Sequence, residues 1–290
     1  MWIGGRPVVT GPPRKVQLPY DGAEVAAVHE AGPEQVDAAV EAAAAAAAAM
    51  RELTLAERAF LLRKAHDKVL ERSEALALAL SSESGKPIRE ARAEVDRAAL
   101  TLLFSSEEAH RLCGEVVPMD ASPAGKGRWA MTLREPVGVI AAITPFNFPL
   151  NLAMHKIGPA IAAGNAVVHK PASATPVTAL MMAGVFEECG LPPGALNVIP
   201  GPGGAIGDLL VSHPKVAMIT FTGSPAVGLR IRSLAGMKRV TLELGSNSAV
   251  IVEDDADLDA AVPRAVAGSF ANSGQVCISV QRIFAHQKVY

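Results

Sequence analysis

The sequence predicts an α/β fold in which an open parallel sheet is covered by helices on both faces. From Val137 to about Gly245, strand-like and helix-like segments alternate without interruption. The strand-like segments are almost continuously apolar, which is typical of strands that are buried on both faces. A chain of 290 residues, of which 50% are hydrophobic, can bury the large core that such a sheet needs.

The residues before Val137 are expected to form helices and an arm. After an entry rich in Pro and Gly, residues 33–113 are rich in Ala, Leu, Glu and Arg at helical spacing, which predicts two or three helices. The alanine tract at 42–49 is flanked by apolar and charged residues at helical spacing, so a packed helix is preferred to a low-complexity segment. Residues 114–136 carry scattered Gly and Pro and predict an extended arm or hairpin.

The alternating region can be divided into individual elements. The expected strands are 137–144, 166–170, 195–200, 216–223 and 238–245, and the expected helices are 151–164, 175–190, 204–213 and 225–236. A strand at 248–252, a helix at 257–274 and a strand-like stretch up to Tyr290 follow. Because parallel sheets bind ligands at the carboxyl ends of their strands, the functional site is expected there.

Composition and charge favour a small-molecule partner. The net charge is −2 and no dense Lys/Arg block occurs, so electrostatics give no reason to expect nucleic acid or an anionic membrane. Apolar stretches such as 157–168 are interrupted before they reach membrane-spanning length, and the first residues lack a secretory pattern. The three cysteines lack C-x-x-C spacing, so no disulfide framework and no metal site are expected, and a cytoplasmic location fits.

Motifs at the ends of the expected strands carry the chemistry. They are TPFNFPL at 144–150, HKPASATP at 169–176, FTGSPAVG at 221–228, LELGSNS at 242–248 and GQVCISVQR at 274–282. In letters and spacing they resemble the aldehyde dehydrogenase superfamily, in its NAD(P)-dependent, hydrolytic branch, from the N-terminal helices to Tyr290.

The resemblance implies a domain organisation. Residues 1–245 would form a Rossmann-like NAD(P)-binding domain with an oligomerisation arm at about 114–136, and residues 246–290 would begin a second, α/β catalytic domain. Relatives are considerably longer, so the chain resembles the N-terminal portion of such an enzyme, ending just after the catalytic cysteine. A homodimer or homotetramer is expected for the full-length family.

Cys277 is the candidate nucleophile. A lone cysteine is more often an inert, small hydrophobic residue. The resemblance implies instead that Cys277 attacks the aldehyde carbon as a thiolate and later leaves from a thioester. It also implies that Asn147 forms an oxyanion hole with the backbone N–H of Cys277. Taken alone, an Asn between two Phe residues and a Pro would be interpreted as a turn residue.

Glu243 is the candidate general base. It ends an apolar strand, where an ionised carboxylate is costly without a partner or a function. A salt bridge is the simplest explanation from the residues alone, whereas the resemblance implies that Glu243 activates the water that hydrolyses the thioester, a role that suits a desolvated carboxylate. The CoA-acylating branch typically lacks this base. The family pattern Glu-Leu-Gly-Gly has Ser246 as its last residue here, a departure that bears on the local backbone and on the width of the pocket.

The remaining motif residues are expected at the cofactor. Lys170 ends an apolar strand, which argues against an ordinary surface lysine, and the matching lysine of relatives reaches the cofactor ribose. Ser173 stands where relatives often carry a glutamate that repels a 2′-phosphate, so NADP is expected to be tolerated or preferred over NAD. Gly223 and Ser224 lie between a strand and a helix whose N–H groups would hold the pyrophosphate. The implied cofactor contacts are Thr144, Pro145, Phe146, Lys170, Ser173, Gly223, Ser224 and Gly245, and Lys170 also belongs to the implied catalytic set with Cys277, Glu243 and Asn147.

The predicted function is therefore the oxidation of an aldehyde to a carboxylic acid with NAD(P)⁺, and two alternatives stay open. Because relatives supply most of the catalytic domain beyond Tyr290, the chain could be a nucleotide-binding fragment or a partner subunit that does not complete the reaction. A reductase of acyl phosphates or acyl-CoA would share the thioester chemistry. The segments at 145–153 and 170–173 favour branches that act on small hydroxy- or phospho-aldehydes or semialdehydes.

Overall fold

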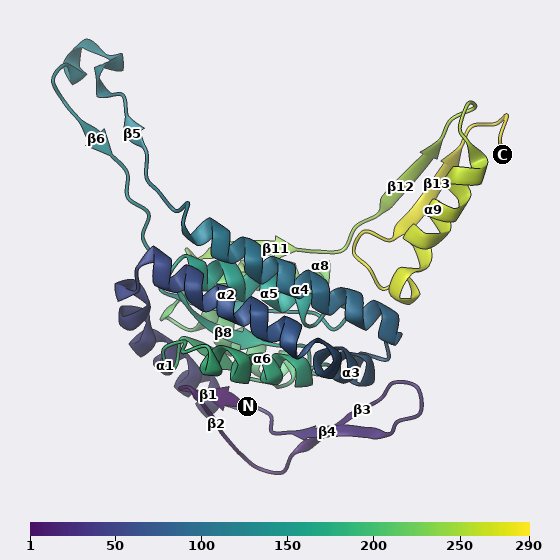
Figure 1. The fold of residues 1–290 in the computed structure, drawn as a ribbon, viewed down its shortest axis with the longest axis horizontal. Helices are drawn as coiled ribbons and strands as arrows, with labels where there is room; N and C mark the ends of the chain where they lie inside the picture. The colour runs from purple at the N-terminus through teal and green to yellow at the C-terminus, as the bar shows by residue number, and fades with distance from the viewer.

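A seven-stranded sheet forms the centre of the structure, a computed structural model that describes residues 1–290 (Figure 1). The strand order is β11-β10-β7-β8-β9-β1-β2. The parallel strands are β7 (Val139–Ile143), β8 (Ala166–Lys170), β9 (Leu196–Val198), β10 (Val216–Thr222) and β11 (Arg239–Glu243), and β1 (Trp2–Ile3) and β2 (Arg6–Pro7) join them in antiparallel orientation. The predicted fold class is confirmed. The antiparallel edge is an addition, because two-residue strands leave no alternating pattern in the sequence.

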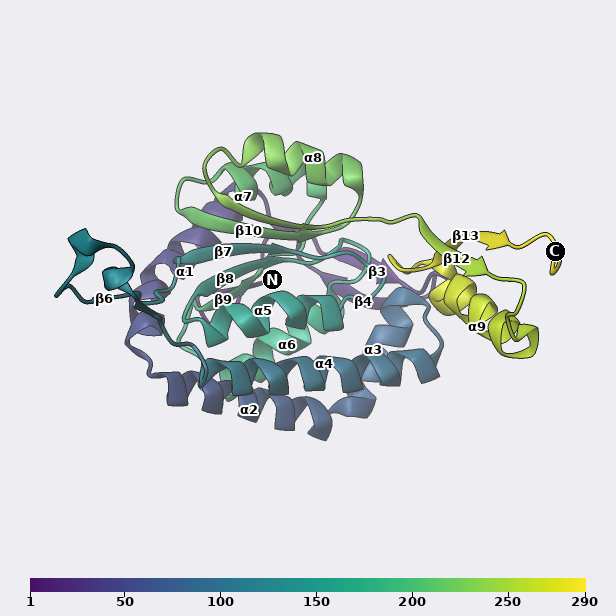
Figure 2. The same ribbon diagram turned by 90° about the horizontal axis from the view of Figure 1, so that it is seen from above.

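Helices cover both faces of this sheet (Figure 2). One face carries α5 (Asn151–Ala162) and α6 (Val177–Glu188), with α2 (Leu55–Glu71), α3 (Ser73–Ser84) and α4 (Ile88–Ala109) outside them, and the other carries α1 (Pro33–Glu52), α7 (Asp208–Ser212) and α8 (Pro225–Leu234). Successive residues of β7 belong to different cores: Ile140 packs with the first group of helices, and Ala141 packs with the second. The strands are therefore buried on both faces, as their apolar sequences predict.

The N-terminal helical region contains four helices rather than the predicted two or three. A capping box begins α2, in which Thr54 Oγ1 accepts the N–H of Glu57 (3.2 Å) and Glu57 Oε2 accepts the N–H of Thr54 (2.8 Å). Gly85 ends α3 in the left-handed conformation, with φ of 72°. These local stop signals interrupt a nearly continuous helical periodicity, which is why the pattern alone gives too few helices. The alanine tract lies in α1 and buries Ala43 and Ala46, so the packed-helix interpretation is confirmed.

Two hairpins extend from the main sheet. The predicted arm is present: β5 (Val116–Val117) pairs with β6 (Ala130–Met131), and the short turns η1 (Met119–Ala121) and η2 (Pro123–Gly125) form its tip, far from the sheet (Figure 1). The second hairpin, β3 (Arg14–Gln17) with β4 (Glu24–Val28), was not predicted. A π-helical turn, η3 (Gly203–Gly207), leads into α7.

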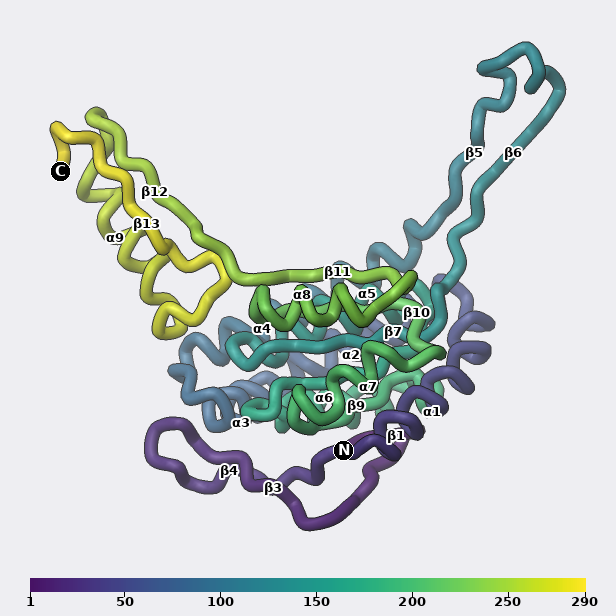
Figure 3. The backbone as a smooth tube through the Cα atoms, turned by 180° about the vertical axis from the view of Figure 1, so that it is seen from behind, coloured from purple at the N-terminus to yellow at the C-terminus, as the bar shows by residue number.

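The last residues form a separate C-terminal unit, residues 248–285 (Figure 3). In it β12 (Ser248–Val252) and β13 (Val280–Ala285) pair in parallel and α9 (Leu258–Phe270) packs on them, followed by the turn η4 (Ala271–Gly274). The unit stands away from the main sheet, and residues 244–247 connect it to β11.

None of the helices has both the length and the apolar character required to cross a bilayer.

Candidate active site

The carboxyl ends of the parallel strands bring predicted residues into one row. β8, β7, β10 and β11 are consecutive in the sheet. The N–H of Thr144 donates to the carbonyl of Lys170 (3.2 Å), and the N–H of Gly223 donates to the carbonyl of Glu243 (3.0 Å). Because neighbouring strands lie about 4.8 Å apart, these four residues follow one another along the same edge. The sheet therefore places residues from four of the sequence motifs together.

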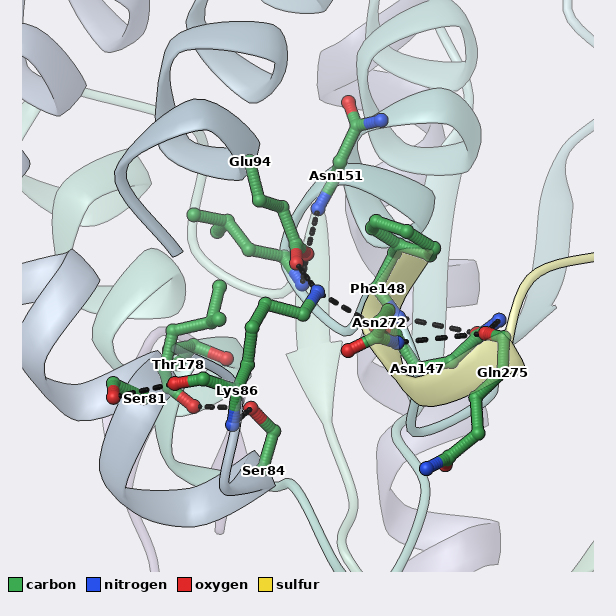
Figure 4. Close-up of polar contacts among 12 residues, drawn as sticks. Ser81, Ser84, Lys86, Glu94, Asn147, Phe148, Asn151, Thr178, Asn272 and Gln275 are labelled. Carbon is green, nitrogen blue, oxygen red and sulfur yellow. Dashed lines mark hydrogen bonds and ion pairs between the residues drawn. The ribbon is translucent and has the colours of Figure 1, made fainter. Parts of the chain in front are cut away.

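The loop between β7 and α5 presents the side-chain amide of Asn147 to the C-terminal unit (Figure 4). Asn147 Oδ1 accepts the N–H of Phe148 (3.1 Å), and this contact orients the amide. Asn147 Nδ2 then donates to the carbonyl of Gln275 (2.8 Å). In the opposite direction, Asn272 Nδ2 donates to the carbonyl of Asn147 (3.2 Å). The loop of Asn147 and the turn that precedes Cys277 are thus joined by two hydrogen bonds.

A left-handed turn leads the chain from α9 to Cys277. Asn272, Ser273 and Gly274 have φ values of 49°, 58° and 76°, and the first two are the only non-glycine residues of the chain with positive φ. A left-handed backbone conformation is costly for a serine, so Ser273 is strained. Strained residues of this kind cluster at functional sites. The carbonyl of Cys277 accepts a hydrogen bond from Ser246 Oγ, so the residue that departs from the family pattern ties the segment after β11 to the cysteine. The thiol-bearing residue itself is exposed.

The surroundings of Glu243 differ from those that the sequence predicts. The sequence predicts a desolvated carboxylate or a salt bridge, whereas the structure leaves Glu243 exposed and without an ion-pair partner. The reason is its position: β11 is the last strand of the sheet, so it has a neighbour on one side only. Both sequence-based expectations for its surroundings are therefore wrong for this structure.

Lys156 is a charged residue of this region that the sequence analysis missed. It lies on α5 and is only 6% exposed, and its Nζ donates to Thr220 Oγ1 (3.1 Å) and Thr222 Oγ1 (2.8 Å) of β10. Burial lowers the pKa of Lys156 to about 8, although the negative charge of Glu243 opposes the shift. A lysine inside the mainly apolar helix NLAMHKIGPAIA was the available signal.

Lys156→Met is expected to remove a pH dependence of stability. The folded pKa of about 8 lies below the unfolded value of 10.5, so the free energy of unfolding rises with pH between these values, and this contribution is lost as the pH falls through 8. At about 1.4 kcal/mol per pKa unit, the difference is on the order of 3 kcal/mol. Urea unfolding at a series of pH values measures it, with the exposed Lys126→Met as control. Identical pH dependences in wild type and Lys156→Met would contradict this account.

Lys170 ends β8 and Ser173 lies in the loop that follows, and both side chains carry groups suited to a ribose. Lys170 is 5% exposed, and its Nζ donates to the carbonyl of Pro171 (3.2 Å). An ammonium group has three donor positions, so this contact leaves capacity for ligand hydroxyls. Burial lowers the pKa of Lys170, and the charge of Glu30 opposes that shift. Ser173 Oγ donates to the carbonyl of Gly201 (3.0 Å). Because residue 173 is a serine, its side chain carries no negative charge.

The N-terminus of α8 is open to solvent and suits an anion. Ser224 caps the helix by accepting the N–H of Val227 (3.4 Å), and Pro225 at the first helical position has no N–H to satisfy. A Cβ at Gly223 would lie 2.4 Å from the ring of Phe221, so the turn requires glycine. Helix N-termini attract phosphate groups. Together with the buried Lys170 at the end of β8, this donor set fits a dinucleotide.

The other implied contacts surround this edge. The hydroxyl of Thr144 is hydrogen-bonded to Nε2 of the buried His169 (2.9 Å), so it is engaged within the core. Pro145 is half-buried, Phe146 is 49% exposed and Gly245 is exposed in the connection to β12. Phe146 and Gly245 are therefore accessible to a ligand, whereas the Thr144 hydroxyl already has a partner.

Comparison with known proteins identifies the family. A family model described as the aldehyde dehydrogenase family matches residues 10–290. The chain belongs to the aldehyde dehydrogenase family. It is 49% identical over 290 residues to the 3-sulfolactaldehyde dehydrogenase of Priestia megaterium, covering 100% of this chain and 60% of that protein. It is 39% identical over 277 residues to the NADP-dependent succinate-semialdehyde dehydrogenase of Escherichia coli, covering 95% of this chain and 57% of that protein.

Solved aldehyde dehydrogenase structures have the same fold. The enzyme from Brucella melitensis superposes with a TM-score of 0.96 at 38% identity, covering 100% of this chain and 60% of that one. The NADP-dependent glyceraldehyde-3-phosphate dehydrogenase of Bacillus halodurans, solved with NADP, gives 0.96 at 37% identity, covering 99% of this chain and 61% of that one. The chain thus spans about 60% of the length of the aldehyde dehydrogenases it matches.

Proposed function

We propose that the chain is the cofactor-binding and nucleophile-bearing part of an aldehyde dehydrogenase that oxidises an aldehyde to a carboxylic acid with NADP or NAD. The main support is the 2.8 Å hydrogen bond from Asn147 Nδ2 to the carbonyl of Gln275, two residues before Cys277. It joins the strand-end loop to the segment of the thiol. Addition to a carbonyl needs such a nucleophile and such a donor side by side.

In the first half of the proposed reaction, the Cys277 thiolate adds to the aldehyde carbon. A C–S bond forms and the carbonyl π electrons move to oxygen, where the amide of Asn147 and the N–H of Cys277 stabilise the charge. A nicotinamide cofactor held by Lys170 and the N-terminus of α8 would supply the acceptor for the hydride that leaves the carbon as the C=O bond re-forms. Cys277 then carries the acyl group as a thioester, which is two electrons more oxidised than the adduct.

In the second half, Glu243 acts on water. Its carboxylate takes a proton as the water oxygen attacks the thioester carbon, the C–S bond breaks, and Cys277 leaves as a thiolate. The carboxylic acid is the product. The exposure of Glu243 supports its access to water, while further protein surface would be needed to exclude bulk solvent from this step.

The proposed cofactor site uses the edge of the sheet. Lys170 would donate to ribose hydroxyls, and Gly223 and Ser224 would place the N-terminus of α8 against the pyrophosphate. Thr144, Pro145, Phe146 and Gly245 complete the proposed contacts. The neutral Ser173 supports acceptance of NADP. The arm at 114–136 is proposed as an oligomerisation element, and the boundary between cofactor and catalytic domains is proposed at 245/246.

The proposed substrate is a short aldehyde that carries an acidic group. The names of the relatives support this class: 3-sulfolactaldehyde, succinate semialdehyde, glutarate semialdehyde and glyceraldehyde 3-phosphate each combine a short aldehyde with an anionic group. A panel of such aldehydes, tested with NADP and with NAD, should show cofactor reduction without added CoA or phosphate. A requirement for CoA or phosphate would assign the chain to acyl transfer instead.

A second candidate is nucleotide binding without turnover. The exposure of both Cys277 and Glu243 favours it, because neither group is enclosed by the described residues. Calorimetric titration with NADP, performed beside the turnover assay, separates the two functions. NADP binding without cofactor reduction by any aldehyde would support the second candidate and exclude oxidation by this chain alone.

Ser173→Glu is expected to raise the KM for NADP by about 10-fold or more while changing the KM for NAD little. The added carboxylate would face the 2′-phosphate of NADP, and like-charge repulsion of about 1.4 kcal/mol already corresponds to a tenfold change. Ser173→Gln is the matched neutral control of nearly the same size. Steady-state kinetics with both cofactors measure the effect, and equal KM values for NADP in the Glu and Gln variants would exclude an electrostatic role for this position.

A further inference from the structure

A buried ion pair lies directly behind the loop of Asn147. Lys86 Nζ is 2.5 Å from Glu94 Oε2, and the two side chains are 1% and 0% exposed. Lys86 belongs to the turn between α3 and α4, and Glu94 belongs to α4. A buried ion pair is often no more stabilising than an apolar pair of the same volume, because both charges lose their hydration. Stability alone therefore does not explain why this ion pair is present, and its contacts with the loop of Asn147 must be considered.

The turn between α3 and α4 holds the backbone of Lys86 and so sets the direction of its side chain. Gly85 ends α3 in the left-handed conformation and Pro87 precedes α4, so the chain reverses between the two helices. Ser81 Oγ donates to the carbonyl of Lys86 (2.7 Å), and the N–H of Lys86 donates to Ser84 Oγ (3.3 Å). The backbone of Lys86 is thus held on both sides, and its side chain extends into the interior.

The ion pair holds both ends of the segment 147–151 (Figure 4). Lys86 Nζ donates to the carbonyl of Asn147 (2.7 Å) and lies 3.9 Å from the centre of the Phe148 ring. Glu94 Oε1 accepts the N–H groups of Leu150 (3.0 Å) and Asn151 (3.1 Å), where α5 begins. One charge therefore holds the start of the segment and the other holds its end.

We propose that Lys86, supported by Glu94, is a positioning residue that aims the side-chain amide of Asn147 at the oxyanion. This inference rests on the proposed function of Asn147. The carbonyl of Asn147 is fixed by Lys86, and its Oδ1 is fixed by the N–H of Phe148, so the Nδ2 donor is left facing the segment of Cys277. Donors that stabilise a developing charge must be oriented before the reaction begins.

A double-mutant cycle tests this role. Lys86→Met is expected to lower kcat by about 100-fold, close to the cost of removing an oxyanion donor, while the KM for NADP stays within about twofold. In an Asn147→Ala background the same change should lower kcat by less than about threefold, because Lys86 acts through Asn147. Lys86→Met/Glu94→Gln removes both charges, so it avoids an unpaired buried carboxylate and should fold with the same kcat defect. Arg92→Met breaks the exposed pair that Arg92, on the same helix as Glu94, makes with Glu74 of α3; it is the matched control and should keep wild-type kcat.

The outcomes separate this inference from the proposed function. Equal kcat losses in the wild-type and Asn147→Ala backgrounds, or a Lys86→Met/Glu94→Gln protein with wild-type kcat, would overturn the positioning role. Wild-type kcat in Asn147→Ala would instead refute the oxyanion role. Hydrogen exchange gives a readout that needs no activity. The amides of Leu150 and Asn151 should exchange faster than in wild type in Lys86→Met/Glu94→Gln, and at the wild-type rate in Asn147→Ala. Unchanged exchange in the double variant would also overturn the inference.

Discussion

Replacement of Cys277 by alanine is expected to lower kcat for aldehyde oxidation by about 10⁴-fold or more. Without the thiol no C–S bond forms, so the hydride would have to leave an aldehyde hydrate rather than a covalent adduct. NADP affinity is expected to remain unchanged, because Lys170 and the N-terminus of α8 belong to the main sheet and its helices, not to the C-terminal unit. The predicted result is loss of turnover with retained cofactor binding.

Cys113→Ala is the matched control for this experiment. Cys113 is exposed like Cys277 but lies at the base of the arm, and Cys189 is buried, which raises the pKa of its thiol and makes it a poor nucleophile. Cys113→Ala should keep kcat within about twofold of wild type. Steady-state kinetics and calorimetric NADP titration measure both effects. A Cys277→Ala protein with undiminished kcat would show that the nucleophile has been misassigned.

The sequence could predict the parts of the site that depend on strand ends. The end of a parallel strand is visible as the last residue of an apolar run, and the sheet brings such ends together whatever the details of packing. Lys170, Thr144, Gly223 and Glu243 could be placed on one edge for this reason, and the main-chain hydrogen bonds between them bear this out. The same logic placed Asn147 in the loop after β7.

The sequence could not predict contacts that depend on how helices pack. Lys156 and Lys86 each occur in segments whose helical pattern is clear, yet their partners lie on β10 and on the loop after β7, which periodicity does not identify. The exposure of Glu243 was missed because an apolar strand sequence does not show whether a further strand lies beyond it. Strand order is a property of the whole chain, and here it leaves β11 at the edge.

Glu243→Gln is expected to separate the two halves of the reaction. Glutamine keeps the size and hydrogen-bonding capacity of the side chain but cannot accept the proton of the attacking water, so hydrolysis of the thioester should slow by about 10²- to 10⁴-fold. Formation of the thioester does not use this carboxylate. One equivalent of NADPH per chain should therefore appear rapidly, followed by very slow turnover.

Mass spectrometry of the quenched Glu243→Gln protein should show an increase equal to the acyl group, located on the peptide that contains Cys277. The double variant Glu243→Gln/Cys277→Ala is the control and should show neither the burst nor the added mass. If Glu243→Gln turned over at the wild-type rate, another group would have to activate the water. If it produced no burst, Glu243 would act before the thioester forms, and its proposed role would have to move from hydrolysis to activation of the Cys277 thiol.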